Sequence, residues 1–293
     1  MSYITFSTLG ESGGMCSQLQ SYASLLAVAK ANGKEIVFSE SMFDKGCTIK
    51  IFDLLKITPN IKPDDFFSNF TSKQIDFHTT SYDKSLFNLD TSINYDLTGR
   101  FDLYTYWYND IKEKIDTWEF KTDLQIQAIN KLNEIKEKSG DKPSVSIHIR
   151  RGDYTLPRNA PLNIINQDYY LQAIAENFEP VNDYSFIIFS NDIDYVKNLH
   201  FVKFINKKYN NIWFVEPKEV DSYSYTSSEK EDLTLLSMCD NHIITNSSYS
   251  WWGAYLSKNP NKKVICPTNW LKGPSFINGN HFPPSWINID NKN

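Results

Sequence analysis

The stretch Val145-Ser-Ile-His-Ile-Arg-Arg-Gly-Asp-Tyr154 decides how the rest of the chain is interpreted. Its first five residues alternate between large apolar and polar side chains, which predicts a buried strand. Arg150, Arg151 and Asp153 follow in the turn past the strand's carboxyl end, where open α/β sheets bind their ligands. Arginine presents a rigid fork of N–H donors that matches two phosphate oxygens. The stretch therefore predicts a nucleotide-phosphate site; the alternative is a pair of solvated arginines that pair with Asp153.

The composition excludes several classes of protein. The chain has 293 residues, 41% hydrophobic and 15% aromatic, which is enough for two domains with a sizeable core. Its net charge of −5 disfavours a general nucleic-acid binder. No run of residues approaches the roughly 18 apolar residues of a membrane span, and the first residues lack the features of a signal peptide. We expect a cytoplasmic protein that at most associates peripherally with the inner face of the cell membrane.

The cysteines and histidines do not have the spacing of a metal site. Four cysteines are widely separated, at Cys16, Cys47, Cys239 and Cys266. Without a CxxC pair they predict reduced thiols, not a zinc site or a disulfide framework. The five histidines form no HExxH pattern.

The start of the chain has the pattern of a nucleotide-binding unit. A strand is predicted at residues 3–7, a glycine-bearing turn at 9–16, a helix at 17–31 and a second strand at 36–38. The backbone N–H groups of the turn, at the helix N-terminus, either cradle an anion or form a tight turn without a ligand.

The middle of the chain contains the predicted domain boundary. Residues 58–94 are irregular and predict loops and short helices, residues 97–107 are strongly aromatic, and residues 118–138 are helical in pattern. Turn-forming residues cluster at 139–143, just before the strand at Val145. We therefore predict an N-terminal domain at residues 1–140 and a C-terminal domain at 141–293.

Strands and helices alternate in the second half. Strands are predicted at residues 145–149, 186–189, 212–215, 242–245 and 264–266, and helices at 167–177, 193–199, 230–239 and 249–257. Apolar strands that alternate with helices predict a doubly wound parallel sheet. The fold class is therefore α/β, with two Rossmann-like domains facing a cleft.

Polar residues follow four of these strands at the same structural point. They are Arg150 to Asp153, then Ser190, Asn191 and Asp192, then Glu216 and Pro217, and then Asn246, Ser247 and Ser248. In a parallel sheet these residues share one edge. The last group precedes a helix, so its hydroxyl and N–H groups either hold a phosphate at the positive end of the helix dipole or form an ordinary N-cap.

Three acidic residues near these strand ends have two interpretations each. Asp232 lies in the helix before the strand that leads to the serine loop. Its carboxylate can accept hydrogen bonds from N1–H and the 2-amino group of guanine, or it is a solvated acid at a helix N-terminus. Asp192 and Asp194 form a DxD pattern, which binds a divalent metal in some nucleotide-diphosphate sites. Because both acids open a helix, where acids are favoured, and because the arginine pair can neutralise a diphosphate, we predict no metal site.

These motifs resemble those of the bacterial α1,2-fucosyltransferases of glycosyltransferase family 11. His148-Ile-Arg-Arg-Gly-Asp-Tyr154 is similar to their HxRRxD motif, and Phe189-Ser-Asn-Asp192 resembles their second motif. Thr245-Asn-Ser-Ser-Tyr-Ser-Trp-Trp-Gly-Ala254 resembles the third motif, which is the most specific match. Leu97-Thr-Gly-Arg-Phe101, with Tyr106, is similar to a weaker aromatic segment. The resemblance extends from about residue 10 to residue 270.

The resemblance implies a GT-B fold and an inverting enzyme of surface-glycan or O-antigen biosynthesis. Such an enzyme transfers L-fucose from GDP-β-L-fucose to a hydroxyl, O2 of a galactoside, on an oligosaccharide or lipid-linked glycan acceptor. No metal or other cofactor is implied. By resemblance, guanine is contacted by His148 and Asp232, the β-phosphate by Arg150, and the diphosphate by Ser247, Ser248 and Tyr249.

One motif departs from the family pattern. The family's first motif is roughly GGxGNQxFQYA, and residues 13–23 here are GGMCSQLQSYA, so Cys16 and Ser17 replace the glycine and asparagine. Backbone contacts to phosphate survive this change, whereas any role of the asparagine side chain does not. Two alternatives therefore stand beside GDP-fucose transfer. One is transfer of another GDP-deoxyhexose, such as GDP-colitose, and the other is a GT-B protein that binds nucleotide or glycan without turnover.

The predicted site combines a donor-binding set with three candidate catalytic residues. The donor-binding set comprises Gly14, Cys16, Ser17, His148, Arg150, Arg151, Ser190, Asn191, Asp192, Asp232, Asn246, Ser247, Ser248 and Tyr249. Arg150 is also predicted to act in catalysis, on the charge of the leaving diphosphate. Glu11 and Asp153 are the candidates for the general base, and a dissociative transition state with little need of a base is the third alternative.

Overall fold

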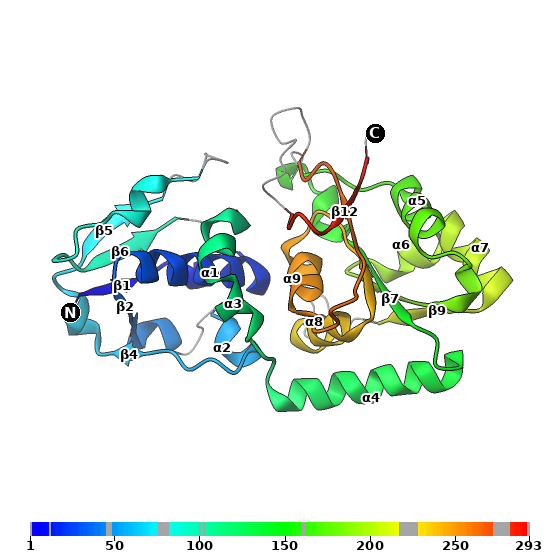
Figure 1. Cartoon of the computed structure of the whole chain (residues 1–293), viewed down its shortest axis with the longest axis horizontal. Coiled ribbons are helices and arrows are strands. Elements are labelled where there is room, and N and C mark those ends of the chain that lie inside the picture. Colours follow the sequence, from blue (N-terminus) through cyan, green and yellow to red (C-terminus); the bar gives the residue numbers. More distant parts are fainter. Residues whose placement is uncertain are drawn as a thin grey trace. The chain divides into compact units, whose positions relative to one another are not determined.

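The computed structural model describes residues 2–11, 13–44, 49–75, 82–99, 101, 103–159, 162–216, 228–271 and 282–291. The chain divides into two compact units, Met1–Lys121 and Thr122–Asn293. Each unit contains a parallel sheet with helices packed on it (Figure 1). The predicted α/β class with two Rossmann-like domains is thus confirmed for the two units. Among the described helices, none combines the length and apolar character that a membrane crossing requires.

The first unit is built on a four-stranded parallel sheet with the order β2-β1-β6-β5. The strands are β1 (Tyr3–Thr5), β2 (Glu35–Ile36), β5 (Thr71–Gln74) and β6 (Tyr95–Thr98), and a separate parallel pair is formed by β3 (Phe38–Ser39) and β4 (Ile61–Lys62). The α-helices are α1 (Met15–Ala31), α2 (Ile51–Leu54) and α3 (Tyr108–Asp116). The predicted opening unit of strand, turn, helix and strand is confirmed, with the second strand divided into β2 and β3.

Two strands of this sheet lie where the sequence predicted loops or made no prediction. Strand β5 has the sequence TSKQ and is largely exposed, while β6 has the sequence YDLT with Leu97 as its buried residue. Such short polar strands lack the hydrophobic pattern from which strands are recognised, and their backbone pairing is what defines them. Short 3-10 helices fill much of the rest of the unit: η1 (Leu9–Glu11), η2 (Glu40–Phe43), η3 (Asp64–Phe67), η4 (Lys84–Phe87) and η5 (Tyr104–Tyr106).

The second unit is built on a six-stranded parallel sheet with the order β12-β11-β10-β7-β8-β9. The strands are β7 (Ser144–Ile149), β8 (Ser185–Ser190), β9 (Ile212–Val215), β10 (Asn241–Ile243), β11 (Val264–Pro267) and β12 (Ile287–Ile289). The predicted doubly wound sheet is confirmed, with β12 as an additional edge strand. The strand order reverses between β7 and β10, and such a topological switch point is where this class of sheet binds its ligands.

Helices cover both faces of the second sheet (Figure 1). One layer contains α5 (Gln167–Asn177), α6 (Ile193–Lys197) and α7 (His200–Tyr209), and its core includes Val145, Ile147 and Phe186. The opposite layer contains α4 (Thr122–Ser139) and α8 (Glu229–Met238), which pack on Ile187 and Phe189. Helix α9 (Ser248–Leu256) packs against α8. The 3-10 helices of this unit are η6 (Gly152–Thr155), η7 (Pro157–Asn159) and η8 (Val181–Asp183).

The division between the units differs from the predicted boundary at residues 140 and 141. Helix α4 belongs to the second unit, because its buried residues Ala128, Leu132 and Ile135 share a core cluster with β8 and α8. The turn formers at 139–143 mark the passage from this helix into β7. The division falls earlier, after Lys121, where the contacts with the first unit's core end.

Candidate active site

Three loops at one edge of the second sheet are joined by hydrogen bonds. The backbone N–H of Arg151 donates to Oδ1 of Asn191 at 3.0 Å, which links the loops after β7 and β8. The hydroxyl of Tyr154 donates to the main-chain oxygen of Asn246 at 2.8 Å, which links the loop after β7 to the loop after β10. The predicted convergence of these three strand ends is therefore confirmed.

The end of β9 takes no part in this network as far as the structure describes it. Glu216 forms an exposed ion pair with Lys197 instead. Pro217 lies outside the described residues. The convergence predicted for four strand ends therefore holds for three of them within the described part of the chain.

Arg150 is held in place by the acid three residues after it. Its Nε lies 2.8 Å from Oδ1 of Asp153, and the two side chains are only 13% and 15% exposed. Asn191 also donates to Oδ1 of Asp153, at 3.3 Å. A charge-assisted bond between two such sheltered groups restricts the guanidinium far more than an exposed pair would. The alternative interpretation, solvated arginines that pair with Asp153, is therefore half right for Arg150: the ion pair with Asp153 is present, but the side chain is sheltered from solvent.

Arg151 is held differently and is more exposed. Its guanidinium carbon lies 3.6 Å from the ring centroid of Tyr195, and its Nε lies 3.5 Å from Oδ2 of Asp192. The side chain of Arg151 is 28% exposed. This stacked and paired position places Arg151 against helix α6, so the two adjacent arginines have distinct surroundings.

The polar groups of the loop after β8 bond to the loop itself, to the end of β7 and to the start of α6. The hydroxyl of Ser190 donates to the carbonyl of Ile149 at 2.8 Å and accepts the N–H of Asp192 at 3.0 Å. Asp192 is also the N-cap of α6, where its Oδ1 accepts the N–H of Tyr195. These contacts brace the loop, so the structure gives Ser190 and Asp192 a supporting place beside Arg151.

His148 is a buried histidine with an uncommitted ring nitrogen. Its side chain is 3% exposed, and its Nδ1 has no hydrogen-bond partner among the described residues. Burial, followed by the charge of Arg150, lowers the pKa of His148 to about 3, so the imidazole is neutral near pH 7. Its ring lies 5.2 Å from the ring of Tyr249. An unsatisfied buried polar atom is rare in proteins, and here it lies at the switch point.

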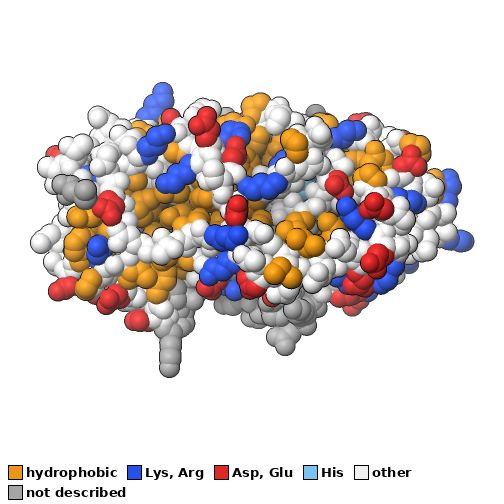
Figure 2. All heavy atoms as spheres, turned by 60° about the horizontal axis from the view of Figure 1, so that its bottom comes forward, with side chains coloured by type: hydrophobic (Ala, Val, Ile, Leu, Met, Phe, Trp, Pro, Cys, Tyr) orange, Lys and Arg blue, Asp and Glu red, His pale blue; other side chains and the backbone are white. Residues whose placement is uncertain are grey.

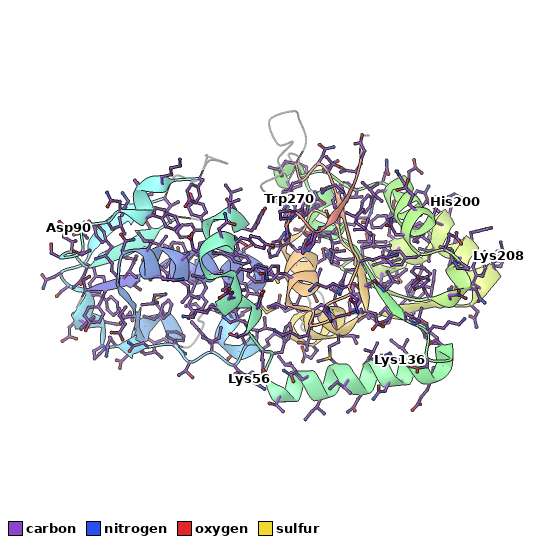
Figure 3. The ribbon with its side chains drawn as sticks, in the orientation of Figure 1. Lys56, Asp90, Lys136, His200, Lys208 and Trp270 are labelled. Atoms are coloured by element: carbon purple, nitrogen blue, oxygen red, sulfur yellow. The ribbon has the colours of Figure 1, made fainter. Side chains whose placement is uncertain are left out.

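The loop between β10 and α9 is anchored by Asn246. This residue is fully buried, and its Nδ2 donates to the carbonyls of Asn163 and Trp270 at 2.8 and 2.7 Å. Trp270 is labelled in Figure 3. The side chain of Asn246 therefore ties together three segments of chain, and its amide nitrogen is committed to these two bonds.

The N-terminus of α9 has the geometry of an anion site. Ser247 is the N-cap, with its hydroxyl accepting the N–H of Tyr249 at 3.4 Å, and Ser248 begins the helix. Helix N-termini carry free N–H groups and a partial positive charge. The hydrogen bond from Tyr154 to Asn246 fixes this helix end beside the Arg150 loop. The two interpretations of the sequence, an N-cap and an anion site, are therefore compatible.

Asp232 lies in the first turn of α8, on the helix that packs against α9. It is half-buried, and its Oδ2 accepts a hydrogen bond from the hydroxyl of Ser228 at 2.7 Å. Tyr249 reaches the same helix end, since its hydroxyl donates to the carbonyl of Glu229 at 3.2 Å. Asp232 and His148 are thus connected through Tyr249 and the start of α8.

The remaining predicted residues lie in the first unit. Gly14 is the N-cap of α1 without a side-chain cap, and Gly13 has a φ of 102°, a conformation that favours glycine. Cys16 is 4% exposed, so its thiol is buried in the first unit. Ser17 is half-buried and Glu11 is exposed in η1. Their arrangement is described within the first unit alone.

The two acids of the DxD pattern have different surroundings. Asp192 is engaged by Arg151 and caps α6, whereas Asp194 is exposed in the first turn of that helix. The residues that the structure describes contain no group of three His, Cys, Asp or Glu side chains arranged to hold a metal ion.

Several supporting residues were not predicted from the sequence. Tyr195 stacks on Arg151, and Asn163 and Trp270 hold Asn246. In the first unit, the side-chain amide of Gln18 donates to the carbonyl of Gly13 in the glycine turn at 3.4 Å and accepts the N–H of Lys50 at 2.8 Å. The position of Tyr154 directly after the arginine stretch was a signal for its role. The others lie in loops or helices where the sequence alone carries no such signal.

Comparison with known proteins identifies a family and a set of relatives. The family model described as glycosyl transferase family 11 matches residues 4–290. An alpha-1,2-colitosyltransferase of Escherichia coli is 30% identical over 203 residues, 68% of this chain. The O-antigen biosynthesis glycosyltransferase WbnK of Escherichia coli is 35% identical over 148 residues, 50% of this chain. The galactoside 2-alpha-L-fucosyltransferase SEC1 of Bos taurus is 23% identical over 261 residues, 85% of this chain.

The matches cover only part of these relatives. The chain spans 66%, 44% and 64% of their lengths, respectively, which is less than two thirds of each.

Solved structures resemble the chain in fold. A complex of Arabidopsis thaliana FUT1 with GDP matches with a TM-score of 0.56 and 11% identity, covering 90% of this chain and 70% of that one. The NodZ alpha-1,6-fucosyltransferase, in crystals soaked with GDP-fucose, matches with a TM-score of 0.51 and 12% identity, covering 89% and 97%. At these identities the likeness establishes the GT-B type of fold.

Proposed function

The chain belongs to glycosyl transferase family 11, and from this premise we propose that it transfers L-fucose from GDP-β-L-fucose to a sugar hydroxyl with inversion. The acceptor that we propose is a galactoside hydroxyl, O2, on an oligosaccharide or lipid-linked glycan. The relatives that act on bacterial O-antigen and on galactosides support this acceptor class.

The observation that carries the proposal is the pairing of Arg150 with the N-terminus of α9. Arg150 is sheltered and fixed by Asp153, and the bond from Tyr154 to Asn246 ties its loop to that helix end. A diphosphate held there meets a guanidinium and the positive end of the helix dipole at once. Both lie at the switch point of a doubly wound sheet, the usual place for a nucleotide.

The same arrangement supports catalysis of sugar transfer. As the bond from the sugar to the diphosphate breaks, negative charge develops on the departing GDP. Donors that are already fixed in position stabilise this charge without reorganising, which lowers the barrier. We propose that Arg150 and the α9 N-terminus provide this stabilisation and that no divalent cation is needed.

We assign Asp153 to positioning Arg150. One of its oxygens already accepts bonds from Arg150 and Asn191, so the residue is committed to the loop. Two alternatives then remain for the general base: the exposed Glu11, or a dissociative transition state with little need of a base.

The nucleoside end of the donor is proposed to lie by His148 and Asp232. A carboxylate recognises the N1–H and 2-amino donors of guanine, and the neutral His148 offers one buried ring nitrogen. Tyr249 lies between the two, against the ring of His148 and bonded to the start of α8.

A second donor, GDP-colitose, is favoured by a specific observation. The relative that matches 68% of this chain at 30% identity is a colitosyltransferase. The replacement of the family's glycine and asparagine by Cys16 and Ser17 also alters one predicted donor contact.

A panel of donors separates these proposals. The protein is incubated with GDP-fucose, GDP-colitose, GDP-mannose or UDP-galactose and a free galactoside, and products are identified by mass spectrometry. We expect a deoxyhexosyl product from GDP-fucose. Product from GDP-colitose alone would replace fucose by colitose, and GDP-sugar binding without product would support the non-catalytic alternative.

A further inference from the structure

Helix α7 presents an outer face that the proposed transfer reaction does not use. Its inner residues Phe201, Val202 and Ile205 are buried in the core of the second unit. Phe204 points the other way and is 59% exposed, the highest value among the large hydrophobic side chains in the described ranges. A single exposed apolar side chain is common on protein surfaces, so the side chains that surround Phe204 decide what this face can bind.

Lysines surround this phenylalanine. Lys203, Lys207 and Lys208 are all exposed, and Lys207 and Lys208 lie three and four residues after Phe204, on the same side of the helix. The Nζ of Lys208 lies 5.6 Å from the ring centroid of Phe204 and 4.9 Å from that of Tyr209. Figure 3 labels Lys208 on the outer side of the unit, and Figure 2 shows basic side chains at this end.

The charge of this face is positive although the whole chain is acidic. The chain carries a net charge of −5, yet the outer face of α7 contributes three lysines. Among the acids, Glu179, from the turn before β8, interacts electrostatically with Lys208. The face is therefore a local basic patch centred on an aromatic ring.

We propose that the outer face of α7, defined as Lys203, Phe204, Lys207 and Lys208, binds an anionic lipid surface. The ring of Phe204 enters the boundary between headgroups and acyl chains, and the ammonium groups meet the lipid phosphates. Lysine stems accommodate this arrangement because they are apolar and carry the charge at the tip. A soluble polyanion supplies the phosphates but not an apolar boundary for Phe204, so the exposed ring favours the membrane.

Co-sedimentation with vesicles tests this surface. The full chain is mixed with vesicles of phosphatidylcholine containing phosphatidylglycerol, or of phosphatidylcholine alone, at low and high salt. We expect binding to the anionic vesicles that weakens at high salt, because surface charges are screened. The double change Lys203→Glu and Lys207→Glu should weaken it roughly tenfold or more, and Phe204→Ala by about fivefold.

Matched variants on another part of the second unit serve as controls. Ile126→Ala removes another exposed apolar side chain, and Lys138→Glu with Lys258→Glu makes the same change in net charge on exposed lysines. Both controls should bind like the unchanged protein, and all variants should retain transferase activity on a soluble acceptor. Failure of the unchanged protein to bind anionic vesicles at low salt overturns the proposal. An equal loss of vesicle binding in the control variants also overturns it. A further contrary result is binding to heparin, without binding to vesicles, that depends on the lysines and is unaffected by Phe204→Ala.

Discussion

The hydroxyl of Tyr154 donates to the main-chain oxygen of Asn246 across a 2.8 Å distance, although the residues are 92 positions apart. This bond joins the loop that carries Arg150 to the N-terminus of α9. The loop after β7 and the loop before α9, which are far apart in the sequence, are thereby fixed to one another at the edge of the sheet.

Tyr154→Phe removes this bond and leaves the ring in place. We expect kcat/KM for the GDP-sugar to fall by about fivefold, because one partly buried hydrogen bond contributes about 1 kcal/mol and the loops separate without it. Steady-state kinetics measure the loss, and thermal unfolding shows whether the fold is intact. Unchanged kinetics would mean that the two loops hold their positions without this bond.

Arg150→Lys keeps the charge but removes the planar fork. We expect most activity to be lost, with kcat falling as well as donor affinity, because charge-assisted bonds contribute about 1.5–3 kcal/mol each and the leaving diphosphate needs them most in the transition state. Single-turnover rates and GDP binding by calorimetry separate the two effects.

Arg151→Lys is the matched control for that change. Arg151 stacks on Tyr195 and pairs loosely with Asp192, so its replacement should cost markedly less activity. Equal losses in the two variants would contradict the distinct positions of the two arginines.

The second sheet could be predicted because its strands are unmistakable in sequence. Buried parallel strands such as β8 are apolar runs, and helices of clear period separate them. Once the strands are parallel, the residues after them share an edge, so the grouping of Arg150, Asn191 and Asn246 follows from topology.

Other parts of the fold and the site depend on contacts between distant residues, which sequence patterns do not indicate. Strand β5 is polar and exposed, and only its backbone bonds to β6 define it. The stacking of Tyr195 on Arg151 joins a residue of helix α6 to a residue of the loop after β7. The place of α4 in the second unit depends on its contacts with α8, whereas turn formers mark only where a helix ends.

Asp232→Asn tests the proposed guanine contact. The amide offers one acceptor where the carboxylate offers two, and its NH₂ would face the donors of guanine. We expect GDP affinity to fall by about 2 kcal/mol or more, since bonds to a charged acceptor are lost and ligand donors are left unpaired. Calorimetry with GDP measures the change. Ser228→Ala removes only the hydroxyl that donates to Asp232 and should have a smaller effect; full GDP affinity after Asp232→Asn would make Asp232 a helix-surface acid.

Two buried histidines predict how stability depends on pH. Burial, with Arg150 as the second cause, lowers the pKa of His148 to about 3, and burial with Lys262 does the same for His242. In the unfolded chain both titrate near 6.5. As pH falls from about 6.5 towards 3, the unfolded state takes up protons that the folded state excludes, so the free energy of unfolding falls. The slope approaches about 1.4 kcal/mol per pH unit for each histidine.

Urea unfolding between pH 7 and pH 5 measures this slope. His242→Gln should make it shallower, whatever its effect on stability at pH 7. Ser146→Ala removes the hydrogen-bond partner of His242 Nδ1 but keeps the imidazole, so its slope should remain steep. An unchanged slope in His242→Gln would show that this imidazole is protonated in the folded chain.

Activity should persist in excess EDTA, and Asp194→Ala should have a mild effect. A departing GDP needs its growing negative charge offset by something already in position. Enzymes with a DxD pattern use a divalent cation held by carboxylates and phosphates. Here Arg150 is fixed at the sheet edge beside the α9 N-terminus, and a cation in the same place would be repelled by the guanidinium. Asp192 is already paired with Arg151, and Asp194 is exposed. Turnover is measured with and without EDTA; loss on chelation that Mn²⁺ or Mg²⁺ reverses would refute the metal-free mechanism and direct attention to these two acids.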